Sequence, residues 1–229
     1  MAIIKLGSNI ADIRKKLGGH VFSKNRGGNY IRMKVTPVNP RTAFQSTVRA
    51  RFAQYSSNWR GLTVAQQQAW QGAVTSYQKS NIFGDLHSPS GLNLYQRLNQ
   101  NLLSSGGTAI NTPAANKGVL VVTAGVLTYT SGTPALSLAY SANIPAATRV
   151  KIFATPPLSA GINFVKSQFR LISTLAPAAV SPANLLTAYN AKYGSVGAVG
   201  TKIFVAIQFV DQVSGMQSPR QIVSAVSAS

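Results

Sequence analysis

The apolar residues of the chain change their spacing twice, and these changes divide the sequence into three regions. Residues 21–35 alternate between apolar and polar positions, which is typical of strands. The connection NRGG at 25–28 contains three residues that tolerate positive φ, so we expect a β-hairpin. Residues 3–17, before it, are compatible with a short helix or a further strand. In the second strand of the hairpin an apolar face opposes a basic face with an aromatic ring: Ile31, Met33 and Val35 against Tyr30, Arg32 and Lys34.

From residue 39 the apolar positions recur at helical spacing. Asn39 followed by Pro40 predicts an N-cap and a first helical turn, and Gly61 predicts the end of this helix. We expect its apolar stripe to pack in a core rather than to hold a ligand. The stripe consists of Phe44, Val48, Phe52, Tyr55 and Trp59.

Two more helices are expected downstream. Thr63 and Gln66 have the spacing of a capping box, which predicts a second helix directly after the first. Because the connection is so short, the two helices should form an antiparallel hairpin with both tryptophans in its seam. The buried stripe of the second helix would be Trp70, Val74 and Tyr77. A third helix from about Ser90 to a stop at Gly106 has its apolar residues at Leu94, Tyr95, Leu98 and Leu102.

Beyond residue 118 the pattern changes to short, mostly alternating strands separated by Gly, Pro, Ser and Asn. The segments are 119–130, 135–141, 149–155, 167–173, 201–211 and 220–227. Such a succession predicts an antiparallel β-sandwich like an immunoglobulin or fibronectin type III domain. One segment departs from it: Ser181 as N-cap, Pro182 in the first turn and Gly194 as stop predict a short helix.

Together these patterns predict an α+β protein with two domains. Residues 1–107 would form a basic hairpin and helical domain that serves for docking, and residues 119–229 the β-sandwich. Between them, TAINTPAANKG at 108–118 has the composition of a linker. With 229 residues, of which 45% are hydrophobic, the chain is long and apolar enough to bury a core.

The charge of the chain has almost entirely one sign. Twenty-two Lys and Arg stand against three acids, Asp12, Asp85 and Asp211, which gives a formal net charge of +19. Residues 1–60 hold twelve of the cations and one acid, for a net +11. The chain cannot neutralise this charge itself, so we expect an anionic partner, either a polyanion or an acidic protein surface.

Some classes of partner and site are disfavoured by what the sequence lacks. There is no cysteine, which excludes disulfides and thiolate metal sites. The first nineteen residues are too polar for a secretory signal. No window approaches the roughly 18 to 20 apolar residues of a membrane-spanning helix, so no membrane association is expected.

No set of residues with catalytic spacing is present. Three isolated Asp and two His cannot easily supply a carboxylate pair, a metal site or a catalytic triad. Asp85 and His87, two positions apart in one loop, come closest, and a turn in which Asp85 caps nearby amides accounts for them better. We therefore expect no enzyme activity and no cofactor.

The basic face of the hairpin is the strongest functional feature. Tyr30, Arg32 and Lys34 are expected to be joined across the hairpin by Phe22 and Lys24, which would place cations beside aromatic rings. Such a surface suits a nucleic-acid backbone with exposed bases, or the acidic surface of a neighbouring protein. The candidate binding residues are Lys24, Arg26, Tyr30, Arg32, Lys34, Arg41, Arg49 and Arg51. Since no base-reading motif is present, contact with nucleic acid would be independent of sequence.

Residues 18–103 resemble a widespread group of phage and prophage proteins. The resemblance rests on a Gly-rich hairpin, the segment Asn39-Pro40-Arg41-Thr42, and a helical pattern that includes Trp59, Leu62, Thr63, Gln67 and Trp70. The later runs SGLNLY at 90–95 and LNQNL at 98–102 also look like that group. The resemblance implies a structural protein of tailed phages rather than an enzyme, and it supplies no catalytic residues.

The sequence thus predicts a bacteriophage virion protein that docks on capsid, collar or tail subunits through its basic N-terminal region. Its partners would be virion proteins with acidic surfaces, further copies of the same chain, and packaged DNA. It would be assembled into the virion in the host cytoplasm. The alternative is a sequence-neutral DNA- or RNA-binding protein that is not a permanent part of the virion.

Overall fold

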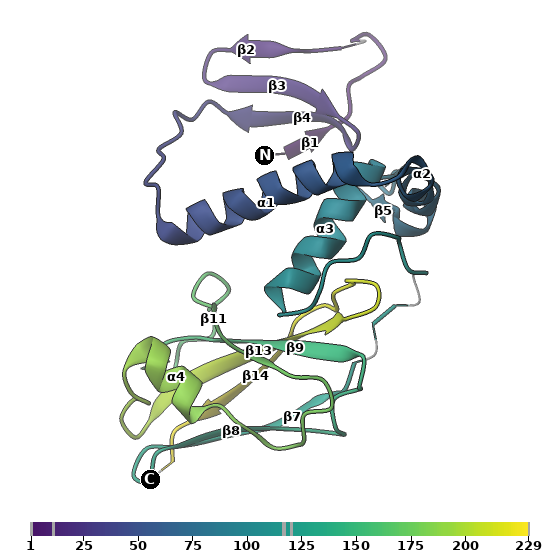
Figure 1. Ribbon diagram of the computed structural model, residues 1–229. Coiled ribbons are helices and arrows are strands. Elements are labelled where there is room, and N and C mark those ends of the chain that lie inside the picture. Colours follow the sequence, from purple (N-terminus) through teal and green to yellow (C-terminus); the bar gives the residue numbers. More distant parts are fainter. Residues whose placement is uncertain (1, 11, 116–117, 120, 229) are drawn as a thin grey trace. The chain divides into compact units, whose positions relative to one another are not determined.

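The described residues form two compact units, which are shown in Figure 1. The computed structural model describes residues 2–10, 12–115, 118–119 and 121–228. The first unit comprises Met1–Arg97 with Asn111–Pro113, and the second comprises Leu98–Ile110 with Ala114–Ser229. Helices and antiparallel sheets are both present, so the protein is α+β. The division between the units falls between Arg97 and Leu98, inside a helix. The linker was predicted at 108–118 instead. Residues 116 and 117 of that segment lie outside the described residues.

The sheet of the first unit is built around the predicted hairpin. β3 (His20–Asn25) and β4 (Gly28–Met33) pair antiparallel, with Asn25 opposite Gly28, so only Arg26 and Gly27 remain in the turn. Gly28 has a φ of 108°, a conformation that a residue with a side chain rarely adopts. The preceding segment forms two strands, β1 (Ala2–Ile4) and β2 (Lys15–Leu17). They complete a four-stranded sheet in the order β1-β4-β3-β2.

Three helices follow this sheet: α1 (Ala43–Gly61), α2 (Val64–Ala73) and α3 (Gly91–Ser104). The predicted end of α1 at Gly61 and the capping box of Thr63 and Gln66 are confirmed. The predicted start of α1 at Asn39 and Pro40 was wrong. Thr42 is the N-cap, because its hydroxyl accepts a hydrogen bond from the Gln45 amide at 3.3 Å.

The antiparallel pairing of the first two helices stays a prediction. Beside their connection, Gln67 Nε2 of α2 donates to the carbonyl oxygen of Trp59 of α1 at 2.9 Å. Both helices also bring aromatic rings to Tyr95 of α3. The ring centroids of Tyr55, Trp59 and Trp70 lie 6.0, 5.6 and 5.4 Å from that of Tyr95, within the range of favourable aromatic pairs. Trp70 and Tyr95 are almost completely buried.

The apolar stripe of α1 is only partly a core stripe. Tyr55 is buried, but Phe44 and Phe52 are 78% and 45% exposed, so the expectation that both pack in a core was wrong. Helical spacing shows that side chains share a face and does not show that a neighbour covers that face. The exposed end of the stripe, at Phe44, follows residues 24–41 in the chain, which carry six of the eight candidate binding residues.

The second unit contains two antiparallel sheets. The larger one has the strand order β10-β13-β9-β11, and β14 also pairs with β13; the smaller one has the order β12-β8-β7. All six predicted strand segments contain strands, and residue 120 of the first segment lies outside the described residues. The strands are β7 (Ala124–Thr130), β8 (Ala135–Tyr140), β9 (Thr148–Ala154), β10 (Leu158–Ser159), β11 (Arg170–Leu175), β12 (Ala183–Asn184), β13 (Thr201–Asp211) and β14 (Gln221–Val226).

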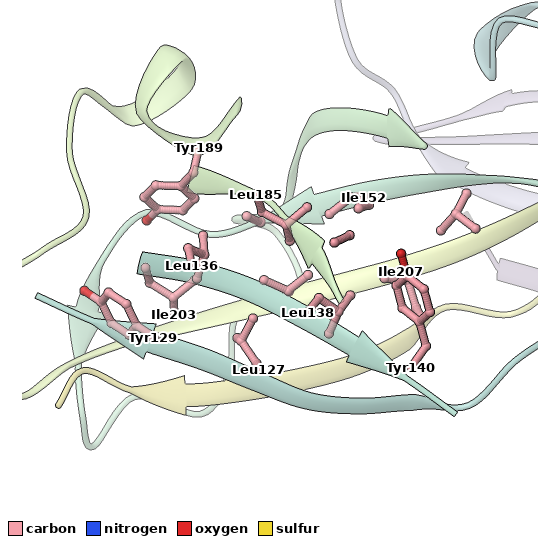
Figure 2. Packing of buried hydrophobic residues seen from close by; sticks show 14 of the residues in the cluster. Leu127, Tyr129, Leu136, Leu138, Tyr140, Ile152, Leu185, Tyr189, Ile203 and Ile207 are labelled. Carbon is pink, nitrogen blue, oxygen red and sulfur yellow. The ribbon is translucent and has the colours of Figure 1, made fainter. Parts of the chain in front are cut away.

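One hydrophobic core joins these two sheets. Alternate residues of β13, such as Ile203 and Ile207, meet side chains of β7 and β8, such as Leu127 and Leu138 (Figure 2). All four are at least nine-tenths buried. Burying a residue of this size contributes about 1.5 to 3 kcal/mol, so this core is a major source of stability for the second unit.

The short helix of the second unit starts later than the sequence predicts. α4 is Leu186–Tyr193 and ends at Gly194 as expected, but Ser181 is not its N-cap. The Ser181 hydroxyl bonds the backbone of Tyr140 instead, accepting from its amide at 3.0 Å. The two residues of β12 then pair with β8 before the helix begins. Pairing with the sheet therefore displaces the predicted helix start.

The aromatic cluster gives a direct test of the first unit. Replacing Tyr95 with Ala removes the ring on which three others pack, and we expect a loss of about 3 to 5 kcal/mol in the free energy of unfolding. Both tryptophans lie in the first unit, so chemical denaturation followed by tryptophan fluorescence reports on that unit. The matched control is Phe44→Ala, which should change stability by less than ~0.5 kcal/mol because the ring is exposed. Equal losses in the two variants would contradict this packing.

Candidate functional site

The register of the four-stranded sheet corrects the predicted basic face. Phe22 lies opposite Ile31, and Lys24 lies opposite Asn29. Because directly paired residues project to the same side of a sheet, Phe22 and Lys24 do not share a face with Tyr30. The neighbours of Tyr30 across the strands are Ser23 and Ile3. The predicted aromatic and cationic platform is therefore wrong.

The cations are distributed over both sides of this sheet. Arg32 lies opposite Val21, which in turn pairs with Lys16, so these two cations share a face. Lys15 and Lys24 lie on the other face, with Phe22. Tyr30 is half-buried, and the cations are exposed. The sheet is thus cationic on both faces.

The remaining candidate residues extend from the hairpin turn to the first helix. Arg26, in the turn, donates from Nη1 to the carbonyl oxygen of Pro89 at 3.2 Å, so its guanidinium is partly engaged within the first unit. Lys34 and Arg41 are exposed on either side of residues 35–40. On α1, Arg49 is exposed and Arg51 is half-buried. Most of the predicted cations are available to a partner.

A strip of exposed apolar side chains accompanies these cations, and the sequence analysis did not predict it. Met33, Val35, Val38 and Phe44 are 72%, 67%, 87% and 78% exposed, and they lie within twelve residues of chain. We call these four residues the apolar strip. Between β4 and α1, the run VTPVNP at 35–40 forms neither helix nor strand, so Val35 and Val38 have no sheet or helix face to pack on. The signal available in the sequence was the position of Val35 and Val38 beside Pro37 and Pro40, which disfavour both helix and strand.

A cavity of about 450 Å³, lined by both polar and apolar residues, lies in the same unit. Its walls come from β1, from the hairpin turn and from the loop between β5 (Lys79–Ser80) and β6 (Leu86–His87). Asp85 and His87, the closest approach to catalytic spacing in the sequence, both line it. Among the described residues no cluster of His and Asp could hold a metal ion.

The loop with Asp85 is a turn, as expected, but its backbone amides are capped by the side chain of Asn81 and not by that of Asp85. The Asn81 side-chain oxygen accepts from the amides of Phe83 and Asp85 at 2.8 and 3.0 Å. The Asp85 carboxylate accepts from Asn81 Nδ2 at 3.0 Å and lies 3.2 Å from Lys5 Nζ. These contacts lower the pKa of Asp85, the bond from Asn81 contributing most and that from Lys5 next. The carboxylate thus holds the loop together.

Two residues that line this cavity each carry a buried polar atom with no hydrogen-bond partner among the described residues. These atoms are the side-chain oxygen of Asn29 and Nδ1 of His87. Buried polar groups are rarely left unsatisfied in this way. Asp85, the acid of this cavity, bonds Asn81 and Lys5.

Comparison with known proteins identifies no family for this chain. No family model matches it, and no curated protein matches it. Among solved structures, a β-1,2-glucanase from Parabacteroides distasonis is similar over 51% of this chain, with 18% identity and a TM-score of 0.28. The matched part is 14% of the glucanase chain. A likeness this low carries no argument about fold or function. Among the described residues no helix is both long and apolar enough to cross a membrane.

The hydrogen bonds of Asp85 give a second test. Since its folded-state pKa is lowered, Asp85 contributes stability above its unfolded-state pKa, and this contribution is lost as the pH falls through the folded-state pKa. Carboxyl NMR titration should therefore give a pKa below the ordinary value of 3.8. Asn81→Ala should raise it towards that value, and Lys5→Gln should raise it by less. A larger effect of the lysine substitution would show that the ion pair dominates.

Proposed function

We propose that the chain is a bacteriophage virion structural protein that docks on acidic surfaces of neighbouring capsid, collar or tail subunits. The first unit would make this contact. The resemblance of residues 18–103 to phage and prophage proteins is the reason for proposing a location in the virion. The proposal includes the absence of enzyme activity, a location in the virion, and association with further copies of the chain.

One observation carries this proposal: the apolar strip lies among cations without carboxylates. From residue 33 to residue 60 the chain has five Lys or Arg and no Asp or Glu. Four large apolar side chains are thus exposed within twelve residues of chain, and where exposed apolar side chains gather they mark sites of contact with other molecules. Cations beside such side chains fit a partner with an apolar centre and an acidic rim.

The same observation favours a protein partner over nucleic acid. A phosphate backbone is recognised by cations and hydrogen-bond donors, and it offers nothing to Val35, Val38 or Met33. Stacking on bases needs free aromatic faces, but Tyr30 is half-buried in the sheet. Phe44 alone among the strip could stack, so the strip as a whole is better explained by protein contact.

The runner-up is a sequence-neutral DNA- or RNA-binding protein. It is favoured by the net charge of +11 in residues 1–60, where cations lie on both faces of the sheet and along α1. It predicts that affinity for DNA falls by roughly 10³ to 10⁵ between 50 and 200 mM salt, if six or more phosphates are neutralised. Docking on protein predicts weak DNA binding at physiological salt.

For the second unit, we propose an immunoglobulin-like or fibronectin type III-like sandwich that is displayed or makes lateral contacts. Two antiparallel sheets with one shared core support this class. The short strand β12 and the helix α4 are additions to the seven strands of a constant-type immunoglobulin sandwich. Such a fold does not by itself determine function.

Purified particles of the source phage provide the first test of the proposed function. Quantitative mass spectrometry should find the chain in a fixed ratio to the major capsid protein. A ratio near one would indicate a shell or decoration protein, and a few to a dozen or so copies would indicate a unique vertex, collar or tail. Absence from the particles would overturn the proposed function in favour of nucleic-acid binding.

Incorporation of surface variants tests the docking surface itself. In particles assembled with the double variant Val38→Ser and Phe44→Ser, we expect at least a ten-fold loss of the chain, because two buried apolar contacts would be missing. Stability should be unchanged, since both side chains are exposed in the free protein. The matched control is Val64→Ser, at a position 71% exposed on α2 and away from the strip. Normal incorporation of the double variant would contradict docking through the strip.

A further inference from the structure

A second candidate binding site lies wholly within the second unit, on the side of the larger sheet that faces away from its core. The core residues of β13 include Ile203, Val205 and Ile207, so Phe204 between them projects to the opposite side. In the register of the sheet, Ala206 lies opposite Phe153 on β9 and opposite Ile222 on β14. The part of this outer side around Phe204 and Ala206 is therefore apolar, although it takes no part in the core.

A pocket of about 320 Å³ is formed where residues 163–169 approach this outer side. Phe204 and Val165 are 7% and 5% exposed and form its buried part, whereas Phe164 is 82% exposed. The rest of the lining is Asn163, Lys166, Phe169, Arg220 and Ile222. A pocket of this size, at the lower end of the range for ligand sites, can take one apolar side chain.

Two of the three cations around this pocket lie over aromatic rings. The Arg220 guanidinium carbon lies 4.1 Å from the ring centroid of Phe153, and Lys202 Nζ lies 4.8 Å from that of Phe204. Lys202 also donates to the side-chain oxygen of Asn163 at 2.8 Å. Lys166 is exposed at the wall of the pocket. Three positive charges therefore surround an apolar hollow.

Among the described residues of this unit, no side-chain carboxylate is close enough to neutralise these charges. Asp211 is the one acid in residues 119–229. It lies seven positions from Phe204 along β13, roughly 23 Å at the rise of an extended strand. Its carboxylate accepts from the Ser214 amide at 2.8 Å. The pocket therefore combines an apolar interior with an unneutralised cationic rim.

The cations also indicate which kind of anion fits. A cation already lies over the ring of Phe204 and another over the ring of Phe153, so these ring faces are not free to stack on nucleic-acid bases. Phosphate contacts alone would leave the apolar interior unused. A carboxylate beside an apolar side chain satisfies both parts of the site.

We propose that this pocket binds an acidic segment of a partner protein, with one apolar side chain in the hollow and flanking carboxylates on Lys166, Lys202 and Arg220. The site is separate from the apolar strip of the first unit. It would give the second unit a contact of its own, whether or not the protein belongs to a virion.

The experiment is an NMR titration of the full-length ¹⁵N-labelled chain with the peptide acetyl-Asp-Asp-Phe-Asp-Asp-amide. We expect amide shifts concentrated at residues 163–169, 204 and 220–222. Replacing the four Asp of the peptide with Ser, or its Phe with Ser, should each weaken binding by about ten-fold, because each removes half of the recognition. No shifts in the pocket at millimolar peptide would overturn the proposal.

Variants of the protein test whether the pocket residues cause this binding. Lys166→Gln and Arg220→Gln should each weaken binding by about five-fold, and Phe164→Ala by a similar factor. The matched control is Lys192→Gln on α4, which removes the same charge outside the pocket and should leave affinity unchanged. Equal losses in all the charge variants would show attraction to net charge alone and would overturn a site at the pocket.

Other anions distinguish the sources of binding. Phenylacetate carries the same ring and carboxylate, and it should shift the same amides but bind more weakly than the peptide. An oligothymidylate of ten nucleotides should bind more weakly still at this pocket. Tighter binding of the oligonucleotide at the same residues would replace the protein partner with nucleic acid. If the pocket fails these tests, the proposed virion function can still hold, because docking in the particle is assigned to the first unit. The mass spectrometry of particles therefore tests that function separately.

Discussion

Scarcity of carboxylates is the constraint on which the surface of this protein depends. Three acids face twenty-two Lys and Arg, and each acid already has a bonding partner within the chain. Asp12 pairs with Arg14 at 2.6 Å, Asp85 with Lys5 at 3.2 Å, and Asp211 accepts from Ser214. Intramolecular ion pairs therefore cannot organise the cations, and any attraction that neutralises them must come from outside the chain.

In place of carboxylates, many cations use carbonyl oxygens and aromatic rings. Arg170 donates to the carbonyl oxygens of Ser167 and Phe169, and Arg97 lies over the ring of Tyr77 at 5.8 Å. Such partners fix the position of a cation and leave its full charge available to an anion. The same chemistry is found at Arg26 in the first unit and at the cationic rim of the pocket in the second.

Local patterns predicted the elements of the fold well and the surfaces poorly. The hairpin, the capping box at Thr63 and all six strand segments follow from short-range chemistry, and they were predicted correctly. The start of α4 was not, because Ser181 bonds the backbone of Tyr140, which lies far away in the sequence. The face shared by Tyr30 and its neighbours depends on strand register, which the sequence does not show. For the same reason, the exposure of Phe44 and the pocket beside Phe204 required the three-dimensional structure.

The position of β13 has a consequence for how the second unit is made. This strand pairs with β9 and β10 along one edge and with β14 along the other, yet it follows β9 by about fifty residues in the chain. During synthesis, which proceeds from the N-terminus, β9 and β11 have an unpaired edge until residues 201–211 leave the ribosome. Unpaired edges favour contact between chains. Nascent copies on one messenger RNA are therefore exposed to mispairing during this interval, whereas the residues of the first unit have already been synthesised.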